Sequence, residues 1–223
     1  MSDLRVTWNY IGGEFCEAQG GELMDNICPA TGNIINRFPK SKAGDVDAAV
    51  KAAREAFEGE WGNWSAEKRA DLLETVADKI TERFDELVQA ESWDTGKPMS
   101  LAAAVDIPRA RDNFRFFAGA IRHESTGCHI MGTSRDGAIN YTLRKPVGVA
   151  GLITPWNLPL YLLTWKVAPA LAMGNTIVAK PSELTPISAT VLAEILDDAG
   201  VPRGVFNLVH GTGLDAGQPL VEH

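Results

Sequence analysis

Cysteine and histidine are scarce in this chain of 223 residues, which has 3 of the first and 4 of the second. The cysteines, Cys16, Cys28 and Cys128, form no CxxC pair, and their number is odd. A disulfide framework and a zinc site are therefore both disfavoured, and we expect no bound metal. The first residues, MSDLRVTWNYIGG, also lack the apolar core of a secretory signal peptide. The cytoplasm is thus the expected compartment.

Clusters of lysine and arginine are absent as well, and the formal net charge is −8. We therefore expect no nucleic acid and no anionic membrane surface among the partners. One uncharged run, at residues 147–165, is long enough to cross a bilayer. However, Pro155 and Pro159 interrupt it with Asn157 between them, which disfavours a continuous helix, and no basic cluster marks either flank. We predict no membrane-spanning segment.

The sequence does contain a clear strand–helix–strand pattern at residues 146–186. An apolar run at 147–153 is followed by a helix-like segment at 160–172 and by a second apolar run at 176–179. Unbroken apolar runs are typical of parallel strands that are buried on both faces. Polar residues follow each strand at its carboxyl end, which is where ligands bind in open α/β sheets. The pattern therefore predicts a parallel sheet with a binding site at one edge.

The same alternation continues to the end of the chain. A helix over 185–200, a third buried strand at 205–209 and a short helix over 214–222 complete a βαβαβα order. This order predicts an α/β fold with a Rossmann-like, doubly wound parallel sheet. No strand follows the last helix, so we expect one sheet edge to be uncovered and the domain to be incomplete at its carboxyl end.

Residues 1–126 read as small hairpins followed by helices. Strand-like runs at 9–15 and 33–38 predict a small antiparallel meander that decorates the domain. The predicted helices cover residues 43–57, a segment that begins at Ser65, a segment that ends at Gly96, 99–105 and 106–123. Ser41 is suited to be the N-cap of the first helix, and we expect the last two helices to be separated near Pro108.

Residues 127–145 differ from both flanks because polar and apolar residues alternate around an Asp136-Gly137 turn. The pattern predicts a protruding β-hairpin with strands at 128–133 and 138–144. A two-stranded ribbon is only marginally stable alone, so it should pair with another part of the fold or with another subunit. We therefore divide the chain into an amino-terminal part at 1–126, the hairpin at 127–145 and a Rossmann-like core at 146–223.

Candidate binding residues lie after the second and third strands of this core. No GxGxxG motif follows the first strand, so the common dinucleotide fingerprint is absent. Lys180 and Glu183 lie where dinucleotide folds place an acidic group on the adenosine ribose, although a solvated turn explains them equally well. A carboxylate there would repel a 2′-phosphate and favour NAD over NADP. Gly211-Thr212-Gly213 could let the backbone approach a pyrophosphate, but such a glycine pair is more often a plain turn.

Three other side chains could take part in chemistry. Asn157, held between two prolines, could donate a hydrogen bond to an oxyanion or could satisfy the backbone of its turn. Arg109 could hold a carboxylate with two hydrogen bonds or could be an exposed helix charge. Lys166 could extend its amine to solvent from an apolar helix or could be buried. On spacing alone, the structural interpretation is favoured for Asn157 and Arg109.

Several motifs together carry a family resemblance. They are Thr154-Pro155-Trp156-Asn157, Trp165-Lys166, Pro169-Ala170-Leu171-Ala172, Gly174-Asn175 and Lys180-Pro181-Ser182-Glu183-Leu184-Thr185-Pro186, with Pro29-Ala30-Thr31-Gly32, Asp94-Thr95-Gly96-Lys97-Pro98 and Pro146-Val147-Gly148-Val149 earlier in the chain. In these motifs, and over nearly its whole length, the chain resembles the amino-terminal half of an aldehyde dehydrogenase. So many Trp, Pro and Gly positions in common make the resemblance specific. It favours the functional interpretation of Asn157, Lys180 and Glu183.

The resemblance implies NAD-dependent oxidation of an aldehyde to a carboxylic acid, which begins with attack by a cysteine thiolate. Asn157 matches the residue whose amide stabilises the oxyanion. The implied cofactor-binding residues are Ile153, Thr154, Pro155, Trp156, Lys180, Pro181, Ser182, Glu183, Gly213 and Gly217. In this family the nucleophilic cysteine and the glutamate that activates water lie beyond the position of His223, and none of the cysteines here matches the nucleophile. Residues 127–145 resemble the hairpin that pairs subunits in a homo-oligomer.

Within that family, the chain most resembles the semialdehyde dehydrogenases that act on 2-aminomuconate or 2-hydroxymuconate semialdehyde. The residues that carry this similarity are Asp106-Ile107-Pro108-Arg109, Asn113-Phe114-Arg115-Phe116-Phe117-Ala118 and Asn157-Leu158-Pro159-Leu160. In that group the arginine that matches Arg109 binds the substrate carboxylate, so Arg109 and Asn157 are the implied substrate-binding residues. The alternative from a different class is a non-catalytic module that binds nucleotide or pairs with other subunits.

Overall fold

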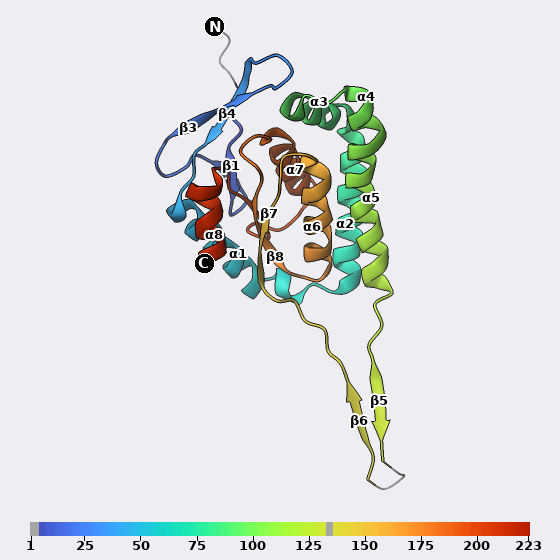
Figure 1. Cartoon of the computed structure of the whole chain (residues 1–223). Helices are drawn as coiled ribbons and strands as arrows, with labels where there is room; N and C mark the ends of the chain where they lie inside the picture. Colours follow the sequence, from blue (N-terminus) through green and yellow to red (C-terminus); the bar gives the residue numbers. More distant parts are fainter. Residues whose placement is uncertain (1–4, 133–135) are drawn as a thin grey trace.

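A five-stranded sheet lies at the centre of the computed structural model, which describes residues 5–132 and 136–223 (Figure 1). Its strand order is β2-β1-β9-β8-β7. Three of these strands are parallel neighbours: β7 (Val149–Ile153), β8 (Thr176–Lys180) and β9 (Phe206–Leu208). All residues of β8 and β9 are buried, as is typical of parallel strands between two layers of helices. The prediction of an α/β fold with a Rossmann-like parallel sheet is confirmed.

The first hairpin, β1 (Asn9–Ile11) and β2 (Glu14–Cys16), extends this sheet, because β1 pairs antiparallel with β9. The prediction of a separate meander is therefore wrong for this hairpin. One edge of the sheet is uncovered, as expected, but it is that of β7, which among the described strands pairs only with β8, whereas β9 has a neighbour on both sides. A polar side chain fixes the attachment: Asn207 of β9 accepts a hydrogen bond of 2.8 Å from the backbone N–H of Gly12.

A second antiparallel pair, β3 (Leu23–Ile27) and β4 (Ile34–Pro39), stands apart from the main sheet. The turn at residues 28–32 joins the two strands, as the sequence predicts. The buried Asn26 side chain anchors the pair, because its amide donates hydrogen bonds of 2.7 Å to both Asn36 and Asp94. Since Asp94 belongs to a helix, these bonds tie the second pair of strands to the helical part of the chain.

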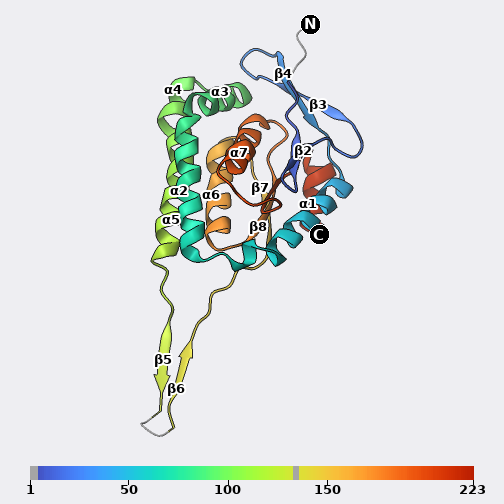
Figure 2. The ribbon, with the colours of Figure 1, turned by 180° about the vertical axis from the view of Figure 1, so that it is seen from behind.

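Helices cover both faces of the main sheet, as Figures 1 and 2 show from opposite sides. One face carries α1 (Ala43–Glu58) and the C-terminal segment, which consists of a π-helical turn (Gly213–Gly217) and α8 (Gln218–Glu222). The other face carries α6 (Pro159–Ala172) and α7 (Ile187–Asp198), with α2 (Ala66–Glu82) and α5 (Ile107–Arg122) packed outside them.

Alternation along β8 explains how one strand serves two cores. Val178 packs with Val46 and Ala49 of α1 in the smaller cluster. Its neighbours Ile177 and Ala179 point the opposite way, into the larger cluster formed with α6 and α7. All three β8 side chains are fully buried. The sheet therefore separates two hydrophobic cores, and its ends are left free to carry polar loops.

Two helix boundaries follow the sequence signals directly. Ser65 is the N-cap of α2, and its hydroxyl accepts a hydrogen bond from the backbone N–H of Lys68 at 3.2 Å. A short 3₁₀ turn, Trp61–Asn63, precedes it. The next helix, α3 (Phe84–Thr95), ends at Gly96, whose φ of 72° lies in the left-handed region. Both predictions are confirmed.

Two other helix predictions are wrong. Lys42, and not Ser41, is the N-cap of α1, because the buried Ser41 hydroxyl accepts a hydrogen bond from a side chain of β1 instead. The expected break near Pro108 is also missing, since α4 (Met99–Leu101) continues into α5 through a π-helical turn, Ala102–Asp106. This wider turn lets the chain stay helical although the proline ring removes one backbone donor.

The hairpin formed by β5 (Cys128–Met131) and β6 (Ala138–Tyr141) projects away from the rest of the fold (Figure 1). Every residue of its two strands is exposed. The predicted hairpin is thus present, with strands shorter than expected, and the part of that prediction at residues 133–135 lies outside the described residues. Among the helices of residues 5–132 and 136–223, none has both the length and the apolar character needed to cross a membrane.

Candidate functional site

The loops that follow β7 and β8 lie at the same edge of the sheet. The two strands are parallel neighbours, and Ile153, the last residue of β7, is the register partner of Lys180, the last residue of β8. Beyond them, the backbone N–H of Thr154 donates a hydrogen bond of 3.2 Å to the Lys180 carbonyl. The loop that carries Asn157 and the loop that carries Glu183 therefore lie at the same edge of the sheet, as the sequence predicts. We call the surface formed by these loops the mouth.

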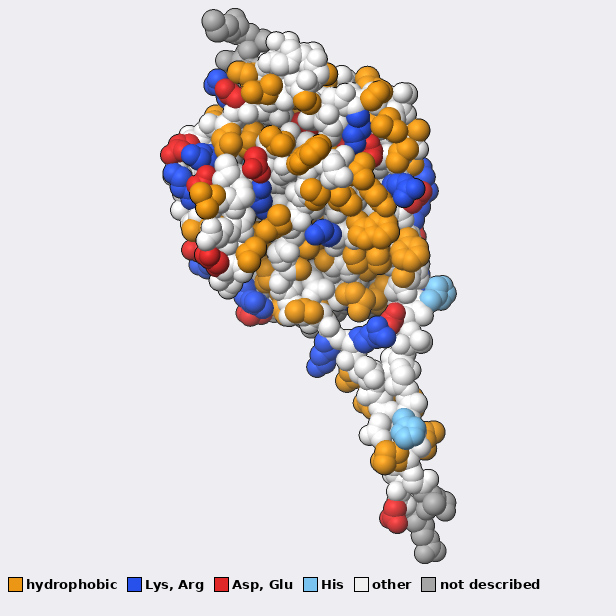
Figure 3. Space-filling model, viewed as in Figure 1, with side chains coloured by type: hydrophobic (Ala, Val, Ile, Leu, Met, Phe, Trp, Pro, Cys, Tyr) orange, Lys and Arg blue, Asp and Glu red, His pale blue; other side chains and the backbone are white. Residues whose placement is uncertain are grey.

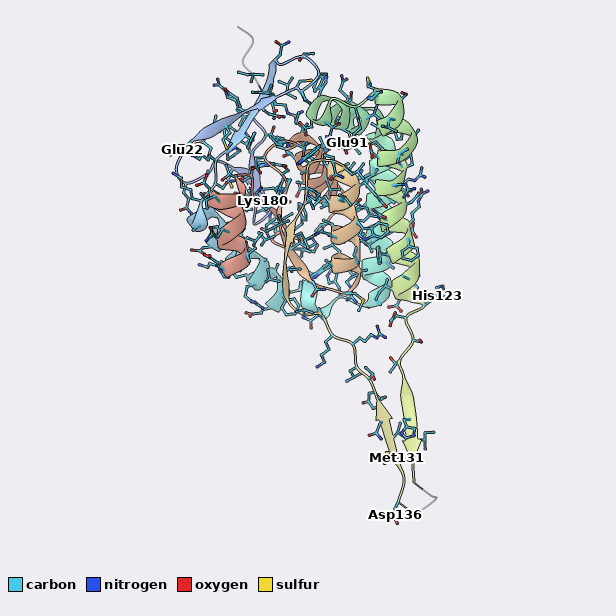
Figure 4. All side chains as sticks on the ribbon, in the orientation of Figure 1. Glu22, Glu91, His123, Met131, Asp136 and Lys180 are labelled. Atoms are coloured by element: carbon cyan, nitrogen blue, oxygen red, sulfur yellow. The ribbon has the colours of Figure 1, made fainter. Side chains whose placement is uncertain are left out.

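Lys180 and Glu183 form a half-buried ion pair at this mouth. The Lys180 amine lies 3.1 Å from a Glu183 carboxylate oxygen, and the Lys180 side chain is only 3% exposed. Figure 4 labels Lys180 in the middle of the domain. Burial raises the pKa of Glu183, but hydrogen bonds from its own backbone, from Lys180 and from the Gly213 backbone outweigh burial and lower this pKa below its usual value. The pair thus presents an ionised carboxylate at neutral pH.

A third loop, which follows β9, approaches the same pair. Thr212 caps the π-helical turn there, because its hydroxyl accepts a hydrogen bond of 3.0 Å from the Asp215 backbone. The two candidate glycines of this turn leave space around Lys180: a methyl group on Gly213 would contact nothing within 4 Å, and one on Gly217 would lie 3.7 Å from the Lys180 side chain. The loops after all three parallel strands therefore converge on the Lys180–Glu183 pair.

The remaining candidate cofactor residues divide into exposed and buried groups. Pro155 and Trp156 are exposed, the latter by 58%, and Ile153 is 39% exposed. Pro181 and Ser182 are buried, and the Ser182 hydroxyl accepts a hydrogen bond from the Leu184 backbone at 3.2 Å. The exposed residues can contact a ligand directly, whereas the buried ones hold the loop that presents Glu183.

Asn157 is exposed on the loop between β7 and α6. Helix α6 begins at Pro159 two residues later, so the loop is short and stiff on its carboxyl side. Lys166, farther along α6, is exposed, and its amine donates to the Ile153 carbonyl at 3.1 Å. The alternative of a buried Lys166 amine is therefore wrong, because the side chain extends back to the end of β7.

Arg109 meets α6 at its first turn. Its guanidinium donates a hydrogen bond of 3.3 Å to the Tyr161 hydroxyl and lies 5.4 Å from the centre of the Tyr161 ring. Sequence reasoning missed Tyr161. The available signal was an amphipathic aromatic residue in the first helical turn after Asn157, in an otherwise apolar segment. The structure thereby places Arg109 next to the segment that carries Asn157.

The three cysteines lie elsewhere. Cys16 is in β2, Cys28 is in the turn between β3 and β4, and Cys128 is in the projecting hairpin. Burial, followed by the charges of Asp45 and Glu14, raises the pKa of Cys16, which disfavours its thiolate. No cluster of three or more metal-ligating His, Cys, Asp or Glu side chains occurs within the part of the chain that the structure describes.

A comparison with known families matches residues 15–223 to the family described as "Aldehyde dehydrogenase family". The chain belongs to the aldehyde dehydrogenase family. This confirms the resemblance that the motifs around Asn157 and Lys180 indicate.

The chain is similar to two curated semialdehyde dehydrogenases over nearly its whole length. It is 51% identical over 217 residues to the 2-hydroxymuconic semialdehyde dehydrogenase of Pseudomonas sp. (strain CF600), covering 96% of this chain and 45% of that protein. It is 52% identical over 218 residues to the 2-aminomuconic semialdehyde dehydrogenase of Danio rerio, covering 98% of this chain and 44% of that protein. The chain therefore spans less than half the length of these aldehyde dehydrogenases.

A solved aldehyde dehydrogenase has the same fold over this length. The NAD⁺ complex of the aldehyde dehydrogenase from Bacillus cereus matches with a TM-score of 0.92 and 42% identity, over 97% of this chain and 44% of that one. The described arrangement is thus that of the amino-terminal region of an aldehyde dehydrogenase. That relative binds NAD⁺.

Proposed function

We propose that the chain forms the NAD-holding and substrate-orienting portion of an enzyme that oxidises a carboxylate-bearing semialdehyde to the carboxylic acid. The observation that carries this proposal is the convergence of the loop bearing Asn157 with the Lys180–Glu183 pair at one edge of the sheet. A nucleotide and an aldehyde must meet at one place for hydride transfer, and this mouth offers groups suited to each.

The residues at the mouth fit NAD. An ionised Glu183, held by Lys180, can accept hydrogen bonds from the two hydroxyls of an adenosine ribose and would repel a 2′-phosphate. Gly213 and Gly217 would face the adenine and pyrophosphate side, while Ile153, Thr154, Pro155 and Trp156 would form the wall beside the cofactor. When bound, NAD⁺ supplies the hydride acceptor.

Asn157 is the residue we assign to the reacting carbonyl. Its exposed amide N–H₂ can donate a hydrogen bond to the oxygen that becomes negative when a thiolate adds to the aldehyde. None of Cys16, Cys28 and Cys128 lies on the three loops of the mouth, so the thiolate must come from outside these 223 residues. The contribution of this chain is then to hold the cofactor and to stabilise the oxyanion.

Arg109 is the residue we assign to the substrate's carboxylate. The names of the two relatives above specify semialdehydes derived from muconic acids, which carry an aldehyde at one end and a carboxylate at the other. A guanidinium can bind such a carboxylate with two parallel hydrogen bonds. The hairpin at residues 127–145, whose strands are fully exposed, is the surface we assign to pairing between subunits.

The test is an assay of aldehyde-dependent NADH formation in the full-length protein that contains this chain. We expect Asn157→Ala to lower kcat by about 10²–10³-fold, because one oxyanion donor is lost, with little change in the Kd of NAD⁺. Asn63→Ala, at another exposed asparagine, is the matched control. Substantial turnover by residues 1–223 alone, or an unchanged kcat in Asn157→Ala, would contradict the proposal.

A further inference from the structure

Arg109 differs from the other arginines of helix α5. Arg111 pairs with Asp112 at 2.8 Å, Arg115 pairs with Asp78 at 3.1 Å, and Arg122 pairs with Asp71 at 2.6 Å. Arg109 makes no ion pair with any residue in the described ranges, and its guanidinium contacts the Tyr161 side chain instead. Its positive charge is therefore held in place without being neutralised.

The contact leaves hydrogen-bond donors on both side chains. Nη1 of Arg109 donates to the Tyr161 hydroxyl oxygen, so this oxygen acts as the acceptor and its own hydrogen is free to point elsewhere. The guanidinium keeps its other N–H groups, because four of its five donors are not needed for this bond. An O–H and a cationic N–H thus stand side by side.

Tyr161 is fixed by a buried polar contact between α5 and α6. The Asn113 amide donates to the Thr164 hydroxyl at 3.0 Å and lies 3.4 Å from the Tyr161 carbonyl oxygen, and Asn113 and Thr164 are buried. The Tyr161 ring also packs edge-on against Trp165, with ring centres 5.6 Å apart. The first turn of α6 is therefore locked to α5, and the phenol is held in position beside Arg109.

The surroundings of the pair are apolar. Figure 3 shows hydrophobic side chains gathered over the face on which α5 and α6 lie, and the exposed apolar side chains of these helices include Phe116 and Trp165. The Lys166 amine, on the same helix α6, is directed to the Ile153 carbonyl at the end of β7. Arg109 and Tyr161 offer a carboxylate on this face one guanidinium and one phenol hydroxyl.

We propose that Tyr161 is a specificity-determining residue that forms, with Arg109, a two-donor clamp for the remote carboxylate of the substrate. The inference deepens the proposed function and rests on it. One carboxylate oxygen accepts from the guanidinium and the other from the phenol, which matches two donors to two acceptors. Tyr161 follows Asn157 by four positions, so the donor for the aldehyde oxygen and the phenol of the clamp belong to one short segment. A neutral substrate leaves the clamp unpaired.

The test compares a six-carbon diacid, adipate, with the neutral hexane-1,6-diol as ligands of the full-length protein, by isothermal titration. Tyr161→Phe keeps the ring and its packing against Trp165 but removes the hydroxyl. We expect it to weaken adipate binding by about 10–100-fold, as for one hydrogen bond to a charged group, and to leave diol binding unchanged. Arg109→Ala should weaken adipate binding further. Tyr10→Phe, which removes a hydroxyl that bonds to Asp197 of α7, is the matched control.

Kinetics provide a second readout. In Tyr161→Phe we expect the KM of a carboxylate-bearing semialdehyde to rise while its kcat and the KM of hexanal stay the same. A purely structural role of Tyr161 would affect both aldehydes equally, and such a result, or unchanged adipate binding, would overturn the inference. Absence of any NADH formation by the wild-type protein would instead contradict the proposed function, and the adipate titration would still decide the clamp.

Discussion

The backbone N–H of Thr154 donates a 3.2 Å hydrogen bond to the carbonyl oxygen of Lys180. This bond extends the pairing of β7 and β8 by one residue past the end of β7. It fixes the loop that carries Asn157 to the residue that holds Glu183. The oxyanion donor and the ribose acceptor that we propose are therefore positioned by one element of backbone structure.

We predict that the Lys180–Glu183 pair favours NAD⁺ over NADP⁺. In Glu183→Gln, the ribose acceptor loses its charge, and we expect the Kd of NAD⁺ to rise by about 10-fold because a charged hydrogen bond is replaced by a neutral one. The ratio of NADP⁺ to NAD⁺ affinity should increase, since the repulsion of a 2′-phosphate is removed. Glu222→Gln, on the exposed end of α8, is the control. Equal NAD⁺ affinity in the variant and the wild type would exclude Glu183 from the site.

Substitutions of the glycines after β9 should affect the free energy of unfolding and the affinity for NAD⁺ differently. Gly217→Ala should keep or slightly raise the free energy of unfolding, because alanine favours a helix by about 1 kcal/mol over glycine, and should weaken NAD⁺ binding by filling the space above Lys180. Gly211→Ala should destabilise the fold by at least ~1 kcal/mol, because its φ is 146° and the new methyl group would lie 3.1 Å from the Ser41 carbonyl oxygen.

Urea denaturation and NAD⁺ titration of the two variants, in parallel, check this prediction. Gly213→Ala is the third variant to measure. A methyl group there would have no atom within 4 Å, so it should cause no clash in the fold. If Gly217→Ala bound NAD⁺ as the wild type does, the third loop would not be part of the cofactor site.

Local patterns in the sequence were sufficient to predict the core of the fold. The structure confirms the strands β7, β8 and β9 and the helix ends at Ser65 and Gly96. Each of these features depends on residues that are neighbours in the sequence. The family resemblance likewise rests on contiguous motifs. These features need no information about distant parts of the chain.

Contacts between distant segments could not be predicted in this way. The attachment of β1 to β9 depends on Asn207, which lies 195 positions from its partner Gly12. Tyr161 becomes a candidate only when α5 is placed beside α6, because its partner Arg109 is 52 positions away. The wrong N-cap at Ser41 has the same cause, since its hydroxyl is used by a strand of the main sheet.

Two buried carboxyl groups predict a pH dependence of stability. Burial raises the pKa of Glu91 to about 7, with Asp106 raising and Lys97 lowering it, and burial raises the pKa of Asp94 to about 7 although Asn26 donates to it. Both groups are protonated more readily in the folded than in the unfolded state. Below pH ~4, the pKa of such a carboxyl group in the unfolded chain, the two groups make their full contribution to the free energy of unfolding. This contribution is lost as the pH rises through 7, the pKa in the folded state.

The free energy of unfolding should consequently fall between pH 5 and pH 8, by an amount on the order of 2–4 kcal/mol for each group. Glu91→Gln should flatten this dependence, because the side chain can no longer ionise. Glu58→Gln, on the exposed end of α1, should leave the slope unchanged. The measurement is urea denaturation at several pH values, and a slope that is identical in Glu91→Gln and the wild type would contradict the prediction.

The projecting hairpin makes a prediction about assembly. Ile130 and Ile139 are opposite each other in the ladder of β5 and β6, and they are 71% and 65% exposed. Two such apolar side chains on a ribbon that is marginal by itself should be covered by another subunit. Ile139→Asp should therefore shift the full-length protein to smaller species in analytical ultracentrifugation, because a charge would be buried without a partner. Asn140→Asp places the same charge on the opposite face of β6 and should leave the mass unchanged. An unchanged mass in Ile139→Asp would show that this face of the hairpin does not join subunits.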